Sequence, residues 1–236
     1  MRGRAPQEVR MGTFTYILHK YQGADEEIVV PDEVVRIGYR AFANMRSAKR
    51  VVLPEGLEQI GENAFSDSLE LEEVVIPDTC SKIGPGAFAG CQSLKELKLP
   101  QRVRALPKRL FTRCGGLERF YIHDDASEIG ESCFRLCKNL EDIHLPDSLR
   151  NIGPFAFAGC ESLREIEIPE GAKTIGKGAF EDCVNLEFVE LPDSITRIES
   201  RAFANCKSLR APHIPASLQF IADDAFAGCG EEEEQE

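Results

Sequence analysis

Apolar residues recur along this chain with a constant period of 23 residues. Phenylalanine marks the period most clearly, at Phe42, Phe65, Phe88, Phe111, Phe134, Phe157, Phe180, Phe203 and Phe226. Proline keeps the same step at Pro31, Pro54, Pro77, Pro100, Pro146, Pro169, Pro192 and Pro215, and His123 takes its place in the fifth copy. Because no insertion or deletion interrupts the series, the pattern predicts nine structural repeats of equal length.

Each period predicts one short strand directly before the proline. Apolar and variable residues alternate there, as in the segments 97–99 (LKL) and 143–145 (IHL). An alternation with period two is typical of a half-buried strand. Proline ends the strand because it has no N–H to give to a central ladder. The Ile-Gly step that follows predicts a bend, since glycine adopts backbone conformations closed to other residues.

One repeat cannot bury its apolar columns alone, so the repeats are expected to stack on one another. Stability is then approximately the sum of terms from each repeat and from its nearest neighbours. The fold class predicted in this way is a repeat solenoid with one long parallel β-sheet and nine coils. Replacing an inner ring such as Phe157 is expected to be costly, because the ring lies between two neighbouring coils.

The strand motif LxxLxLP, at residues 94–100 and 163–169, resembles the leucine-rich-repeat core. Together with IGxxAFxxCxxL at residues 152–163, it resembles the BspA-like class of leucine-rich repeats found in bacteria and protists. The resemblance implies a right-handed leucine-rich-repeat coil and a role in adhesion or protein recognition, often at a cell surface. Residues 14–30 also resemble the half-repeat that begins such arrays, which implies an N-terminal cap.

The predicted organisation is a single folded domain between two short tails. Residues 1–13 are expected to be a flexible N-terminus, residues 14–230 the solenoid, and residues 231–236 an acidic disordered tail. The first residues lack the apolar run of a secretory signal. As written, the chain is therefore expected in the cytoplasm, whereas a fragment of a longer chain would be compatible with a secreted or cell-surface location.

Charge argues against nucleic acid or an anionic membrane as the partner. The chain has 40 acidic and 28 basic residues, for a formal net charge of −12. Both partners demand clustered lysine and arginine, and no such cluster is visible in the sequence. No membrane insertion is expected, because no stretch reaches the length of a membrane span.

Nine cysteines raise the question of disulfides or zinc. Seven of them occupy one column of the repeat, and Cys80 and Cys133 occupy other inward columns. Buried free thiols are the preferred interpretation, because free cysteine is among the most buried residue types. Cysteine-bound metal remains a weaker alternative, since only Cys133 and Cys137 have a spacing that suits zinc. A metal or acid–base site near His144 is likewise a weaker alternative to an ordinary solvated face.

The regular columns account for nearly every apolar residue and leave variation to the surface. We therefore expect a non-catalytic protein-binding scaffold that uses its sheet face and needs no cofactor or metal. The alternative is a cell-surface adhesin or host-interaction protein of the same fold. Candidate contact residues gather where copies four to six depart from the consensus: Lys98, Arg119, Tyr121, His123 and His144. Tyrosine and arginine often carry binding energy, and this site is expected to prefer an acidic or mixed protein surface; simple drift of a middle repeat is the alternative.

Three valines form a second feature of the predicted sheet face. Val29, Val52 and Val75 fall in the same outward column of the first three coils. They are interpreted as a simple strand preference, as a surface covered by the segment 14–21, or as an apolar contact for a partner or for weak self-association.

Overall fold

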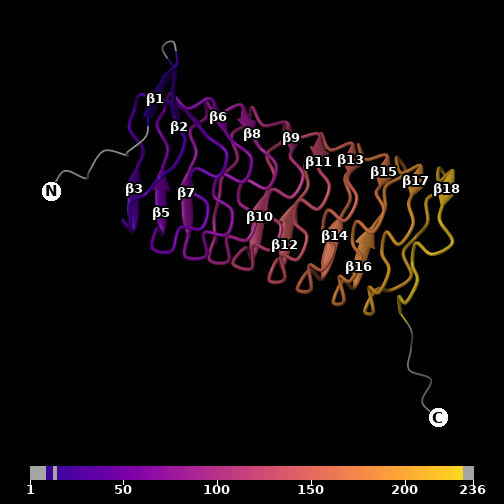
Figure 1. Ribbon diagram of the computed structural model, residues 1–236. Coiled ribbons are helices and arrows are strands. Elements are labelled where there is room, and N and C mark those ends of the chain that lie inside the picture. Colours follow the sequence, from indigo (N-terminus) through magenta and orange to yellow (C-terminus); the bar gives the residue numbers. More distant parts are fainter. Residues whose placement is uncertain (1–8, 13–14, 231–236) are drawn as a thin grey trace.

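The computed structural model describes residues 9–12 and 15–230 of the chain. Every regular element in these residues is a β-strand. The chain winds as a solenoid of about nine coils with two rows of strands, and the first and last strands, β1 (Val9–Gly12) and β18 (Phe220–Ile221), lie at opposite ends of the solenoid (Figure 1). The predicted repeat solenoid is confirmed.

The first row contains the strands predicted before the prolines, and we call its exposed side the strand face. Its members are β3 (Glu27–Val29), β5 (Arg50–Val52), β7 (Glu73–Val75), β10 (Arg119–Tyr121), β12 (Asp142–His144), β14 (Glu165–Glu167) and β16 (Phe188–Glu190). The strands pair in parallel as β3-β5-β7, β10-β12 and β14-β16. The fourth coil contributes only a bridge between Glu73 and Glu96, although its sequence follows the pattern.

A second row of parallel strands lies where the sequence predicted a bend, which differs from the single sheet expected. It contains β4 (Val34–Ile37), β6 (Gln59–Ile60), β8 (Lys82–Ile83), β9 (Ala105–Leu106), β11 (Glu128–Ile129), β13 (Asn151–Ile152), β15 (Thr174–Ile175), β17 (Arg197–Ile198) and β18 (Phe220–Ile221). In six of these nine strands the final isoleucine is followed by a glycine, which allows close approach between coils: Gly38, Gly61, Gly84, Gly130, Gly153 and Gly176. A Cβ on Gly61 would lie 2.8 Å from the carbonyl carbon of Gly38 one coil earlier.

The core is a ladder of stacked phenylalanine rings that runs along the solenoid. Neighbouring rings of the ladder lie between 5.0 and 5.9 Å apart, with interplanar angles of 2 to 26°. The rings from Phe42 to Phe203 are fully buried. Phe226 in the last coil is only half-buried, because no described coil covers it.

Seven cysteines form a second ladder beside the rings. Each thiol donates a hydrogen bond to the carbonyl oxygen of a phenylalanine in the preceding coil, from Cys91 to Phe65 at 3.2 Å through to Cys229 to Phe203 at 2.8 Å. Ser68 occupies the same column in the second coil and donates its hydroxyl to Phe42 in the same way, at 2.8 Å. All nine cysteines are free and all but Cys229 are buried, so the preferred interpretation of the cysteines is confirmed.

A short hairpin begins the solenoid. Strand β1 (Val9–Gly12) pairs antiparallel with β2 (Thr15–Leu18), and β2 pairs in parallel with β4 of the first coil. The ring of Tyr21 lies 5.4 Å from that of Phe42 and covers the first rung of the phenylalanine ladder. The predicted N-terminal cap is thus present, and its strand β1 falls within the segment expected to be flexible. Residues 1–8, 13–14 and the acidic tail 231–236 lie outside the described residues.

Candidate functional site

The strand face is built from one buried and two exposed residues per strand. The central residue of each three-residue strand points into the core, as Phe120 and Ile143 do. The two flanking residues face solvent, because successive side chains of a strand point to opposite sides. Binding residues on this face must therefore come from two columns, which begin at Glu27 and Val29 and repeat every 23 residues.

Two aromatic residues stack on each other in the middle of the strand face. Tyr121 on β10 stands in register with His144 on β12. Their rings are nearly parallel, at 4° and with centroids 4.8 Å apart. The Tyr121 side chain is 58% exposed, and its hydroxyl donates to Oδ1 of Asp124 at 2.9 Å. This hydrogen bond raises the pKa of Tyr121, so the phenol remains neutral and able to donate at physiological pH.

The predicted cations Lys98 and Arg119 are also exposed, in neighbouring coils of the same face. Neither forms an ion pair within 4.0 Å with any residue that the structure describes. Beneath them, Phe120 packs its ring 4.9 Å from Phe111 and 5.2 Å from Phe134, which fixes the position of β10. The structure thus brings Lys98, Arg119, Tyr121 and His144 together on one exposed surface.

His123 does not belong to this surface, and its predicted outward position is wrong. The side chain is only 6% exposed. It occupies the proline column, which turns inward, as the buried Pro100 and Pro146 in the adjacent coils show. Its Nε2 lies 3.1 Å from the carbonyl oxygen of Val103. Because a carbonyl only accepts, Nε2 carries the proton, while Nδ1 has no hydrogen-bond partner among the described residues.

The three valines form an exposed apolar stripe at the N-terminal end of the strand face. Val29, Val52 and Val75 stand in register on β3, β5 and β7. Val29 is 71% and Val75 37% exposed. Strand β2 pairs with β4 in the other row of strands, so the described part of the segment 14–21 does not cover the stripe as one interpretation proposed. Phe14 of that segment lies outside the described residues.

Charged residues beside the valine stripe alternate in sign and pair with one another. Arg50 binds Glu27 at 2.6 Å and Glu73 at 2.8 Å across adjacent strands. Opposite charges in register stabilise a sheet. At this end of the strand face, the charged column therefore serves the sheet itself.

A cleft lies over β12, β14 and β16 that the sequence did not single out. It has a volume of about 500 Å³ and is lined by Asp142, His144, Glu165, Glu167, Phe188 and Glu190. We call this hollow the acidic cleft. Its signal in the sequence is visible only after the two exposed columns are compared coil by coil, because the four carboxylates come from three successive repeats.

A larger hollow of about 720 Å³ lies away from the strand face, and its carboxylates are paired within the chain. Arg201 binds Glu181 at 2.6 Å, Lys138 binds Glu161 at 2.7 Å, and Asn205 donates to Asp182 at 2.8 Å. These pairs satisfy its carboxylates within the chain. Among the described residues, no group of three or more histidine, cysteine, aspartate or glutamate side chains is placed to hold a metal ion.

The buried thiols are held in their protonated form. Burial raises the pKa of Cys91, Cys137 and Cys183 to about 12 and that of Cys80 to about 11. A nucleophilic cysteine requires the opposite shift and an accessible sulfur. These four side chains therefore have a packing role.

Comparison with known proteins identifies the repeat. The sequence matches the BspA type leucine-rich repeat region in six copies, over residues 19–141 and 127–233. The chain belongs to the BspA-type leucine-rich-repeat family. The predicted family is thereby confirmed, and its members are repeat proteins. No match is found among curated proteins.

Solved structures of bacterial leucine-rich-repeat proteins share the fold of this BspA-type chain. The leucine-rich repeat protein of T. pallidum is 27% identical, with a TM-score of 0.70, over 76% of this chain and 87% of that protein. The pneumococcal vaccine antigen PcpA is 22% identical, with a TM-score of 0.52, over 82% of this chain and 57% of the antigen. The described residues of this chain include no helix long and apolar enough to cross a membrane.

Proposed function

We propose that this BspA-type chain is a non-catalytic scaffold that binds another protein through its strand face. The observation that carries the proposal is the exposed Tyr121–His144 stack, which lies beside Arg119 and Lys98 on a face whose other side is packed in the core. An exposed tyrosine offers a large apolar area with a polar end, which is typical of residues that dominate binding energy. Stacking on His144 holds its ring in one orientation, so little conformational entropy is lost on binding.

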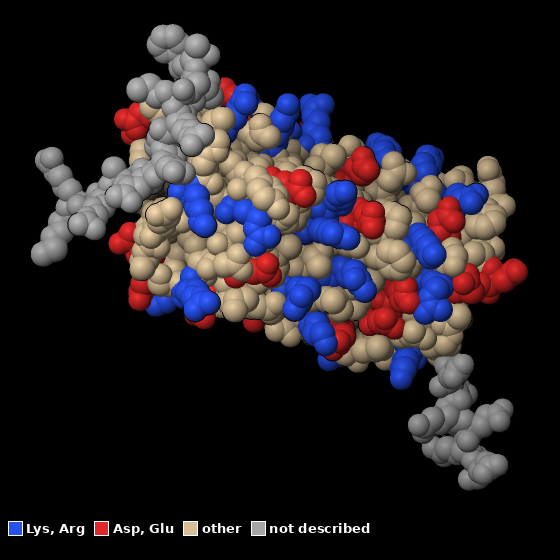
Figure 2. Space-filling view, viewed as in Figure 1, with Lys and Arg blue, Asp and Glu red and all other residues tan. Residues whose placement is uncertain are grey.

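The charge pattern supports a protein as the partner. Lysine and arginine are interspersed with aspartate and glutamate over the face shown in Figure 2. Nucleic-acid binding requires a basic stripe that neutralises several phosphates. Arg119 and Lys98 instead form a small cationic group that suits carboxylates on a partner protein.

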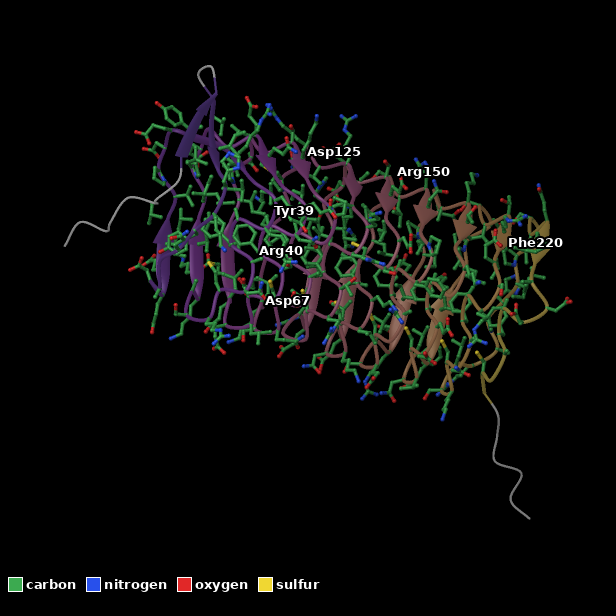
Figure 3. The ribbon with its side chains drawn as sticks, viewed as in Figure 1. Tyr39, Arg40, Asp67, Asp125, Arg150 and Phe220 are labelled. Atoms are coloured by element: carbon green, nitrogen blue, oxygen red, sulfur yellow. The ribbon has the colours of Figure 1, made fainter. Side chains whose placement is uncertain are left out.

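The test compares two exposed tyrosines. Tyr39, labelled in Figure 3, is 63% exposed but lies in the turn after β4 and not on a strand of the strand face. Partners are captured from the native lysate, and the purified partner is titrated by calorimetry against the parent, Tyr121→Ala and Tyr39→Ala. We expect Tyr121→Ala to weaken binding by about tenfold or more and Tyr39→Ala to leave it unchanged. Equal affinity for all three proteins would refute the placement of the site.

The second candidate is a cell-surface adhesin of the same fold. Membership of the BspA-type family favours it, because the resemblance associates these repeats with adhesion and surface display. Protease treatment of intact native cells, followed by immunoblotting, separates the two roles. Loss of the protein from intact cells would favour the adhesin, and protection until lysis would favour an internal scaffold.

A further inference from the structure

The acidic cleft differs from the first three coils of the strand face because its carboxylates have no cationic partners among the described residues. Glu165, Glu167 and Glu190 are exposed. None of them forms an ion pair within 4.0 Å with a described residue, and the same holds for Asp142, although Arg119 stands opposite it in register. In the first three coils, by contrast, the acids of the strand face are neutralised by Arg50 at 2.6 and 2.8 Å.

The register of the strands makes the arrangement costly to the free protein. Glu167 on β14 stands directly opposite Glu190 on β16. Like charges in this position destabilise a sheet, whereas opposite charges stabilise it. A strand face selected only for stability would continue the alternation seen in the first three coils. The repulsion is relieved when a cation enters between the two carboxylates.

One wall of the cleft is an aromatic ring that already holds a guanidinium group. Phe188 is 47% exposed, and Cζ of Arg210 lies 4.5 Å from its ring centroid. The ring of His144 lines the opposite side of the cleft. A site with an aromatic surface on one side and carboxylates around it favours a planar guanidinium, and therefore favours arginine over lysine.

We propose that the acidic cleft binds an extended protein segment that carries closely spaced arginines. This proposal rests on the proposed function and adds the chemistry of the partner. Neighbouring strands lie about 4.8 Å apart, so the carboxylates from β12 to β16 extend over roughly 10 Å. Alternate side chains of an extended segment are about 6.7 Å apart. Two arginines separated by one or two residues can therefore each reach a carboxylate, and each guanidinium binds it through two parallel hydrogen bonds.

The partner surface inferred here complements the site around Tyr121. Lys98 and Arg119 suit acidic residues on a partner, whereas the acidic cleft suits basic ones. The two charge fields are adjacent, because β10 and β12 are paired neighbours. A partner whose bound segment has acidic residues at one end and arginines at the other fits both, and the polarity fixes its direction along the solenoid.

The experiment uses a fluorescein-labelled peptide of sequence Gly-Arg-Ser-Arg-Ser-Arg-Gly and its lysine counterpart. Binding is measured by fluorescence anisotropy at about 50 mM salt, where exposed charges are only partly screened. The cleft variant is Glu167→Gln with Glu190→Gln. The matched control is Glu62→Gln with Glu131→Gln, which removes the same charge from exposed turns that follow the second row of strands.

We expect the cleft variant to weaken binding of the arginine peptide by about tenfold or more and the control by less than about twofold. The lysine peptide should bind more weakly than the arginine peptide to the parent. Phe188→Leu should reduce this preference without changing the charge. Equal loss in the cleft variant and the control would overturn the proposal, since it would assign the binding to overall charge. Unchanged affinity in the cleft variant would overturn it as well.

Failure of this proposal is distinguishable from failure of the proposed function. If the native partner depends on Tyr121 but not on Glu167 and Glu190, the scaffold function stands and the arginine segment is wrong. If the peptide binds in the cleft but no partner depends on Tyr121, the arginine-binding cleft stands and the proposed function through Tyr121 is wrong. Thermal unfolding verifies that the cleft variant folds, and its melting temperature should not fall, because the substitution removes a repulsion.

Discussion

The phenylalanine ladder predicts that the cost of losing a ring depends on its number of stacked neighbours. Phe157 is fully buried and stacks between Phe134 at 5.4 Å and Phe180 at 5.2 Å. Truncating a buried phenylalanine to alanine costs about 3–5 kcal/mol through lost transfer energy and the cavity left behind. Two favourable ring contacts contribute about 0.5–1.5 kcal/mol each. Phe157→Ala is therefore expected in the upper part of that range.

Phe226 provides the matched control within the same column. It is half-buried and stacks on one neighbour in the ladder, Phe203, at 5.0 Å. Phe226→Ala should cost roughly half as much as Phe157→Ala, because less apolar area leaves water and only one stack is lost. Urea unfolding followed by circular dichroism measures both free energies of unfolding. Equal losses, or an unchanged midpoint for Phe157→Ala, would refute the ladder as the source of stability.

Three further outcomes follow from the coils. Without reductant, only Cys229 should react rapidly with a thiol reagent in the folded protein, and all nine thiols should react after unfolding. Fast reaction of several thiols in the folded protein would contradict the buried cysteine ladder. Gly159→Ala should lower the free energy of unfolding by about 1–2 kcal/mol, because φ is +73° and a Cβ would lie 2.7 Å from Leu136. The control Gly56→Ala, whose Cβ would have its nearest contact at 3.9 Å, should be nearly neutral in the same thermal unfolding experiment. Glu190→Lys should raise the melting temperature by on the order of 1 °C, because it replaces a pair of like charges with a lysine opposite Glu167. The gain should shrink in high salt, and a salt-independent gain would argue against an electrostatic cause.

The inward columns were predictable from the sequence because each carries the same physical demand in every coil. Rings, thiols and aliphatic side chains must fit between two identical neighbours, so their types recur at a constant step. The same reasoning predicted the strands of the first row and the free cysteines. It did not predict the second row of strands, because its members are as short as two residues and most are followed by a glycine that was interpreted as a bend.

The prediction of His123 as an exposed residue failed for a related reason. The proline column was interpreted only by its effect on the strand, through the missing N–H, and not by where its side chain points. The structure shows that this column is buried in the fourth, fifth and sixth coils. A polar residue placed there enters the core, where it binds the carbonyl oxygen of Val103. Whether the side chains of a column point inward or outward must therefore be known before a substitution in that column is interpreted as functional.

The acidic cleft illustrates why the exposed columns resist prediction from one sequence. Each exposed position tolerates nearly any residue, since the inward columns supply the stability of the coil and its neighbours. A pair of like charges such as Glu167 opposite Glu190 can then persist at a modest cost to the stability of the fold. The identity of such residues has no period, so no rule of the repeat anticipates them. Their arrangement appears only when the coils are stacked and the charges of separate repeats become neighbours, so the exposed columns of the strand face, rather than the repeat, give the surface of this solenoid its individual charge pattern.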